Sequence, residues 1–216
     1  LMPRTQHRPL PTHALTVREA LIFAVTLTVV GTVLLLFVNI IAAGLSVFSL
    51  LLYAFAYTPL KTKSNVAVFV GAFPGALPPL IGWVAVQGTV GIEILAIFMI
   101  QFVWQFPHFW AIAWVSDEDY RKAGIRLLPS GERNFSSSLQ ILTYTLLLLP
   151  VGLMPWWLLG FTNSIAASVI TICGLLFSVQ ALYLLIKSNR RAALLLMFGS
   201  FIYLPVVQIA LLVGRM

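Results

Sequence analysis

The chain has 216 residues, of which 60% are hydrophobic and only 9% are charged. Soluble domains carry about 25% charged residues, so this composition excludes an ordinary soluble protein and predicts an all-α polytopic membrane protein. The formal net charge of +7 would indicate a nucleic-acid partner in a soluble chain, but here the cations follow membrane topology. We therefore expect a lipid bilayer and no nucleic acid as the surroundings of this chain.

Seven apolar runs are long enough to cross about 30 Å of bilayer hydrocarbon. In chain order they are Glu19–Val38, Ile40–Tyr57, Val66–Val86, Ile92–Val115, Leu139–Leu159, Ser164–Ile186 and Ala193–Val213. Placing the N-terminus in the cytoplasm leaves only Arg215, of the thirteen Lys and Arg residues, on the outer side. The long charged connection 116–138 then faces the cytoplasm, and we predict that the chemistry takes place there.

Two groups of cations come first along the chain. Arg4 and Arg8 are spaced so that two guanidiniums can hold an anion such as a diphosphate. The second group follows at the end of the second span, where Pro59 is expected to stop the helix. Its members are Tyr57, Lys61, Lys63 and Asn65. The alternative for both groups is ordinary: topology-determining arginines, snorkelling lysines and an interfacial tyrosine.

The third span is rich in glycine and proline, and helix packing is the simpler explanation for its small residues. The fourth span carries a polar stripe, because Gln101, Gln105 and His108 recur at i, i+4 and i+7 on one helix face. Polar residues that stay inside a span are functional candidates. Trp104 is a packing residue by default, but facing inward it can lie against a flat macrocycle.

Extending the helical period of this span brings Asp119 back to nearly the same face, about 16 Å beyond His108. Asp119 lies in an acidic group with Asp117 and Glu118, which offers enough carboxylate to hold a magnesium ion. The alternative is a solvated loop in which Ser116 or Asp117 caps a short helix.

Six segments, in this order and at these intervals, resemble the protohaem IX farnesyltransferases of the UbiA-type intramembrane prenyltransferase superfamily. They are RTQHRPL (4–10), YTPLKTKSN (57–65), GAFPGALPPLIGW (71–83), WQFPHFW (104–110), DYRKAGIRLLP (119–129) and MFGSFIYLPVVQ (197–208). The resemblance covers essentially the whole chain. It implies a bundle of nine membrane helices around a cavity that opens to the cytoplasm and to lipid.

The resemblance also implies a reaction: a farnesyl group passes from farnesyl diphosphate to a vinyl group of protohaem IX, giving haem O and pyrophosphate. Magnesium is the implied cofactor. The implied location is the bacterial cytoplasmic (inner) membrane with the active site facing the cytoplasm. A haem A synthase or a terminal oxidase is an assembly partner expected only at the level of the family.

The matching motifs carry roles over to individual residues. His108 and Asp119 are the expected catalytic residues, and Asp119, with Asp117 as the weaker match, is the expected metal ligand. His108 would act as an axial haem ligand or as a proton-handling group, with Gln105 and Trp104 also on the acceptor side. The expected diphosphate-binding residues are Arg4, Arg8, Tyr57, Lys61, Lys63 and Asn65.

One departure from the family pattern concerns the N-terminus. An acidic motif NxxxDxxxD is expected just before RTQHRPL, but the chain starts at Leu1. We therefore expect residues 1–216 to form one transmembrane domain with seven of nine spans, without the first two helices and the first Asp-rich motif, and inactive by itself. The alternatives are a prenyltransferase for a quinone precursor or another aromatic acceptor and, from a different class, a haem-binding membrane module or a transporter.

Overall fold

The computed structural model describes residues 5–216, and in that range the regular structure consists of helices and one isolated β-bridge between Thr162 and Arg215. The helices are α1 (Val17–Val38), α2 (Ile40–Leu51), the π-helical segment η2 (Leu52–Tyr57), α3 (Thr58–Leu60), α4 (Ala67–Gln87), α5 (Ile92–Val115), α6 (Asp117–Lys122), α7 (Phe135–Trp157), α8 (Ser164–Lys187) and α9 (Arg190–Val213). Seven helical stretches in this range, with Ile40–Leu60 counted as one, are long and apolar enough to span a membrane. The all-α fold and the seven spans are confirmed, and the chain is an integral membrane protein.

Three spans begin earlier than their apolar runs indicate: α1 by two residues, and α7 and α9 by more. Helix α7 begins at Phe135 because the side chain of Asn134 accepts a hydrogen bond of 2.9 Å from the backbone N–H of Ser137. Helix α9 begins at Arg190 for the same reason, since the Asn189 side chain accepts from the N–H of Ala192 at 2.9 Å. The first turns are polar, so hydropathy alone places both starts too late.

The second span ends at Leu60, one residue after Pro59, which is close to the predicted position. The unexpected feature is η2, the π-helical turn directly before α3. The backbone N–H of Thr58 donates to the carbonyl of Tyr53, and the Thr58 hydroxyl donates to the same carbonyl at 2.9 Å. A proline removes an i→i−4 bond, and this five-residue register accommodates the loss without breaking the helix.

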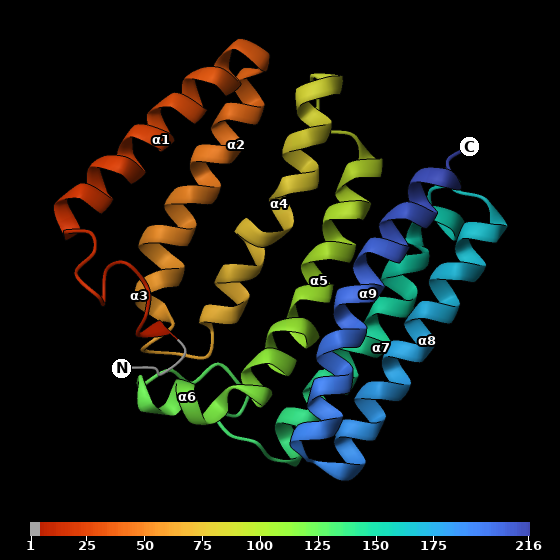
Figure 1. Ribbon diagram of the computed structural model, residues 1–216. Helices are drawn as coiled ribbons and strands as arrows, with labels where there is room; N and C mark the ends of the chain where they lie inside the picture. The colour runs from red at the N-terminus through yellow and green to blue at the C-terminus, as the bar shows by residue number, and fades with distance from the viewer. Residues whose placement is uncertain (1–4) are drawn as a thin grey trace.

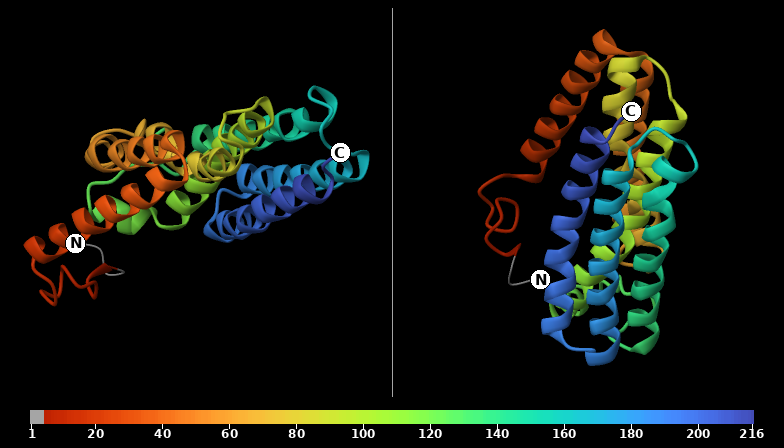
Figure 2. Two further views of the ribbon diagram at one scale, coloured as in Figure 1. Left: turned by 90° about the horizontal axis from the view of Figure 1, so that it is seen from above. Right: turned by 90° about the vertical axis from the view of Figure 1, so that its right-hand side faces the viewer.

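The helices form a ring and a row (Figure 1). In the ring, α7 packs on α5 and α8, and α9 closes it by packing on α8 and α5. The row extends from α5 through α4 and α2 to α1 at the edge of the molecule. The view from above in Figure 2 shows α1 on the outside of this row. The larger apolar core lies within the ring, and a smaller one joins α2, α4 and α5.

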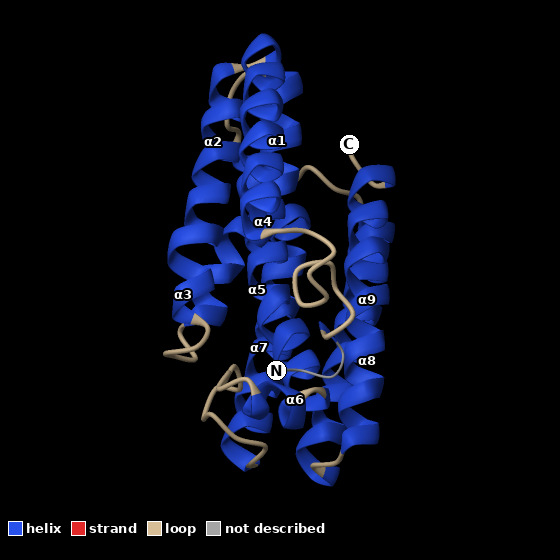
Figure 3. Cartoon of the chain, turned by 60° about the vertical axis from the view of Figure 1, so that its left-hand side comes forward, coloured by secondary structure: helices blue, strands red, loops and turns tan. Residues whose placement is uncertain are grey.

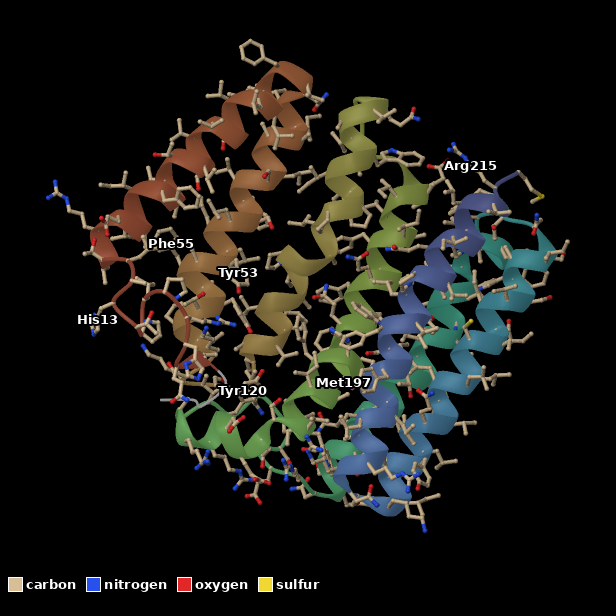
Figure 4. All side chains as sticks on the ribbon, in the orientation of Figure 1. His13, Tyr53, Phe55, Tyr120, Met197 and Arg215 are labelled. Atoms are coloured by element: carbon tan, nitrogen blue, oxygen red, sulfur yellow. The ribbon has the colours of Figure 1, made fainter. Side chains whose placement is uncertain are left out.

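The two ends of the bundle differ in charge. The segment before α1, the short helices α3 and α6, and the turn between α8 and α9 all lie at one end, where Figure 3 shows most of the loop structure. We name this the charged end, because every described Lys and Arg except Arg215 belongs to these segments, to the loops that follow α3 and α6, or to the helix termini beside them. Figure 4 shows Arg215 at the opposite end from Tyr120 of α6.

Candidate functional site

The polar stripe of α5 begins at Gln101, which joins three helices. Pro79 has no N–H, so the carbonyl of Gly75 in α4 lacks its helical donor. The Gln101 amide nitrogen donates to that carbonyl at 2.8 Å. Its amide oxygen accepts from Nε2 of Gln208 in α9 at 2.9 Å. The buried glutamine therefore satisfies a backbone group that the proline exposes, and it ties α4, α5 and α9 together.

Gln105, one turn further along α5, also contacts α4. Its Nε2 donates to the carbonyl of Ala72 at 2.9 Å, and its amide lies against Gly75, where an added Cβ would overlap it. Gly71 likewise leaves room for Tyr57, since a Cβ at Gly71 would lie 2.7 Å from the tyrosine ring. The role of these two glycines in close helix packing is as expected. Gln105 as an acceptor-binding residue remains a prediction, and its amide is engaged by α4.

His108 completes the stripe and faces α9. Its ring stacks on the indole of Trp104, with 4.3 Å between centroids and 17° between planes. Its Nδ1 lies 2.8 Å from the hydroxyl oxygen of Ser200, and Nε1 of Trp104 donates to the carbonyl of the same serine at 3.0 Å. The ring centroid of Phe201 lies 5.2 Å from that of the imidazole. The contact between α5 and α9 thus holds a histidine and an indole as one stacked pair.

The predicted alignment of Asp119 with His108 is wrong. Helix α5 ends at Val115, and Ser116 takes non-helical dihedral angles of −102° and 13°. The chain then turns into α6, which runs across the charged end instead of continuing α5 (Figure 1). A helical period extrapolated over eleven residues fails because the helix stops after seven of them.

The two candidate metal carboxylates have different surroundings. Asp117 is 8% exposed and its Oδ2 pairs with Nε of Arg121 at 2.9 Å and with Nε of Arg133 at 3.5 Å. Arg133 also donates to the carbonyl of Trp114 at 2.8 Å, so Asp117 anchors the loop before α7 to the end of α5. Asp119 is half-buried and makes no ion pair with any residue that the structure describes.

No group of three or more His, Cys, Asp or Glu residues within 5–216 is arranged to hold a metal ion. Magnesium does not need such a cage, because it is commonly bound through one or two carboxylates together with waters and substrate phosphates. The carboxylate of Asp119, which is unpaired as far as residues 5–216 are concerned, fits that mode. Asp117 as a metal ligand stays the weaker prediction, since its Oδ2 is already paired with two arginines.

A polar cavity of about 430 Å³ lies at the charged end, between the loop after α3 and the loop after α6. Its lining residues are Thr62, Lys63, Ser64, Asn65, Gly124, Arg126, Ser130 and Gly131. The Asn65 side chain donates to the carbonyl of Pro129 and so joins the two loops. Gly124 and Gly131 have positive φ angles of 71° and 81°, which bend the second loop around the cavity.

This cavity brings together Lys63 and Asn65 as expected, and it adds Arg126 and Ser130, which the sequence analysis missed. Both residues lie in the long charged connection that the sequence analysis singled out. A loop sequence, however, does not show which of its residues face another loop. Tyr57 and Lys61 are neighbours, with the ammonium 5.9 Å from the ring centroid. Arg8 lies in the exposed loop before α1, and Arg4 is outside the described residues.

Comparison with known proteins identifies relatives of this whole arrangement. A protoheme IX farnesyltransferase from Cytophaga hutchinsonii is 52% identical over all of this chain and 76% of its own length. One from Flavobacterium johnsoniae is 42% identical over all of this chain and 73% of its length. A solved structure from work on digeranylgeranylglyceryl phosphate synthase in membranes has the same fold, with a TM-score of 0.78 and 22% identity over 98% of this chain and 75% of that one.

The UbiA prenyltransferase family matches residues 1–202. The similarity to the protoheme IX farnesyltransferases is the one that the six motifs predicted. This chain therefore belongs to the UbiA prenyltransferase family, and its enzyme class is that of a prenyltransferase.

Proposed function

We propose that this chain transfers a farnesyl group from farnesyl diphosphate to a vinyl group of protohaem IX, giving haem O and pyrophosphate. The observation that carries the proposal is the stacked pair of His108 and Trp104 in the contact between α5 and α9, where Nε2 of His108 has no hydrogen-bond partner among residues 5–216. The names of relatives that are 52% and 42% identical over the whole chain support the same acceptor.

The reaction balances with one water molecule. The C1–O bond of farnesyl diphosphate breaks and pyrophosphate leaves with the electron pair. C1 then bonds to the terminal vinyl carbon, and water adds to the other vinyl carbon and loses a proton. Negative charge grows on the leaving group as the C1–O bond breaks, so fixed cations bind the transition state more strongly than the substrate.

The charged end supplies these cations. Lys63 and Arg126 line the polar cavity, and Lys61 lies beside Tyr57 at the end of α3. Arg8 and Arg4 would add guanidiniums from the N-terminal segment. Asn65 fixes the geometry, because its side chain holds the loop after α3 against the loop after α6.

Prenyltransferases of this family generally use a divalent metal ion. We infer that the ion here is magnesium, held by Asp119 together with diphosphate oxygens. Bound there, it would neutralise charge on the departing pyrophosphate. Asp117 serves the site by pairing with Arg121 and Arg133, which keeps α6 in place.

His108 acts on the acceptor side in this proposal. No residue that the structure describes bonds to its Nε2, so this nitrogen can ligate the haem iron or take the proton from the attacking water. The indole of Trp104 supplies a flat apolar surface beside it. The positive charge of the charged end favours an orientation with that end in the cytoplasm, which for a bacterial protein means the inner membrane.

The test is a farnesylation assay in membranes with haem B, farnesyl diphosphate and magnesium, with haem O detected by mass. Two versions are expressed: residues 1–216 alone, and the same residues together with whatever coding sequence the gene places before Leu1. Formation of haem O supports the proposal. Prenylation of a quinone precursor in place of haem by these membranes would overturn the acceptor but keep the enzyme class.

A pair of lysine variants tests the charged end. Lys63→Ala removes a cation from the polar cavity, and we expect it to raise the KM for farnesyl diphosphate about tenfold. Lys187→Ala, an exposed lysine at the same end on α8, should leave KM unchanged. Equal effects of the two substitutions would mean that the cavity does not hold the diphosphate.

A further inference from the structure

Ser200 in α9 is hydrogen-bonded to both rings of the stacked pair. It is completely buried, with 0% exposure. Its backbone carbonyl accepts the indole N–H of Trp104 at 3.0 Å. Its hydroxyl oxygen lies 2.6 Å from the carbonyl of Met197 and 2.8 Å from Nδ1 of His108.

The single hydrogen of the Ser200 hydroxyl indicates which ring nitrogen of His108 is protonated. A serine hydroxyl has one hydrogen and can accept through its lone pairs, whereas a carbonyl only accepts. Both contacts are satisfied when the hydrogen of Ser200 goes to the Met197 carbonyl and the hydroxyl oxygen accepts from Nδ1 of His108. In that arrangement Nδ1 of His108 carries the proton, and Nε2 keeps a lone pair to which no residue within 5–216 donates.

We propose that Ser200 is a positioning residue that sets the tautomer and the ring direction of His108, so that the unprotonated Nε2 faces the acceptor. The identity of that acceptor rests on the proposed function, but the tautomer does not. A hydrogen bond to the second ring nitrogen is a general means of orienting a histidine that ligates a metal or moves a proton. The carbonyl of Ser200 also accepts from the indole of Trp104, so the same residue fixes the ring that stacks on the imidazole.

The chain contains a matched control for this role. Ser178 in α8 is also buried, and its hydroxyl donates to the carbonyl of Gly174 at 2.9 Å. That bond stays within its own helix, and no hydrogen bond among residues 5–216 joins Ser178 to either ring of the stacked pair. Removing the Ser178 hydroxyl therefore repeats the packing change of a Ser200 substitution without touching His108.

The first experiment measures the tautomer directly by nitrogen NMR of the chain labelled with ¹⁵N-histidine in micelles. The sequence contains three histidines, and His108→Ala identifies the signals of His108 by their loss. We expect a protonated Nδ1 and an unprotonated Nε2 in the parent, in Ser178→Ala and in Ser200→Thr, which keeps a hydroxyl. In Ser200→Ala the proton should shift toward Nε2. A parent with its proton on Nε2, or a Ser200→Ala variant with the parental pattern, would overturn the inference.

The second experiment titrates the same variants with protohaem IX and follows the Soret absorption. Loss of an outer hydrogen bond typically weakens metal binding 10- to 100-fold, so we expect at least about a tenfold loss of affinity in Ser200→Ala. Ser178→Ala should bind as the parent does. If the tautomer shifts as expected but no variant binds protohaem, the positioning role holds and the proposed acceptor fails. If Ser200→Ala binds protohaem normally with an unchanged tautomer, the acceptor stands and the positioning role fails.

Discussion

Helices α1 and α5 are both membrane spans, but they differ most in apolar content and in how many of their residues are buried. Of the seven spans in the described chain, α1 is the most apolar and α5 the least. No residue of α1 is buried, whereas twelve residues of α5 are, including Gln101 and Gln105. The most apolar span is thus the one without buried residues, while polar side chains indicate where a helix meets other helices.

The hydrogen bonds explain the contrast. On α1 the hydroxyl of Thr28 donates to the carbonyl of Ala24 within the same helix, at 2.8 Å. On α5 the polar side chains bond to α4 and α9 instead, and His108 belongs to this group. The span that carries the candidate site therefore also holds the bundle together.

The largest expected effect comes from the end of the α5 stripe. His108→Ala removes the imidazole that we propose as iron ligand or proton acceptor, and we expect farnesyl transfer to fall about 100-fold or more. The measurement is the rate of haem O formation in membranes at equal protein levels. His7→Ala, in the exposed loop before α1, should retain the parental rate. A His108→Ala variant as active as His7→Ala would show that the reaction does not need the imidazole at the end of the α5 stripe.

A smaller effect is expected where α4 meets α5. Gly75→Ala places a methyl group on the amide of Gln105, and the overlap should lower the free energy of unfolding by about 1–3 kcal/mol. Gly31→Ala on α1 meets no atom within 4 Å, and the better helix propensity of alanine should leave that free energy unchanged or raise it by up to about 1 kcal/mol. Unfolding in mixed micelles, followed by tryptophan fluorescence, measures both. If both variants show the same stability, tight packing is not what separates α5 from α1.

The smallest effect concerns a single hydrogen-bond network. Gln101→Leu leaves the carbonyl of Gly75 and the amide of Gln208 without a partner, and we expect a loss of about 1–2 kcal/mol in the same unfolding measurement. Thr28→Val on α1 removes only a bond within one helix, so its change should stay below about 0.5 kcal/mol. A Gln101→Leu variant of unchanged stability would show that water or relaxation replaces the network.

The contrast between α1 and α5 was visible in the sequence only in part. The polar stripe at 101, 105 and 108 indicated that α5 is an inner helix, because lipid does not solvate such groups. That α1 has no buried residue was not visible, since a wholly apolar run suits an inner and an outer position equally. The alignment of Asp119 with His108 failed because periodicity holds only while the helix continues.

The sequence by itself determined the seven spans, the charged end and the residue types of the candidate site, because span length, hydropathy and the distribution of charge act locally along the chain. The tertiary structure alone decided which polar groups became partners. Gln101 meets Gln208 across 107 positions, and His108 meets Ser200 across 92. Helical periodicity specifies the face on which a side chain lies, but only the packing of α5 on α9 specifies what that face touches.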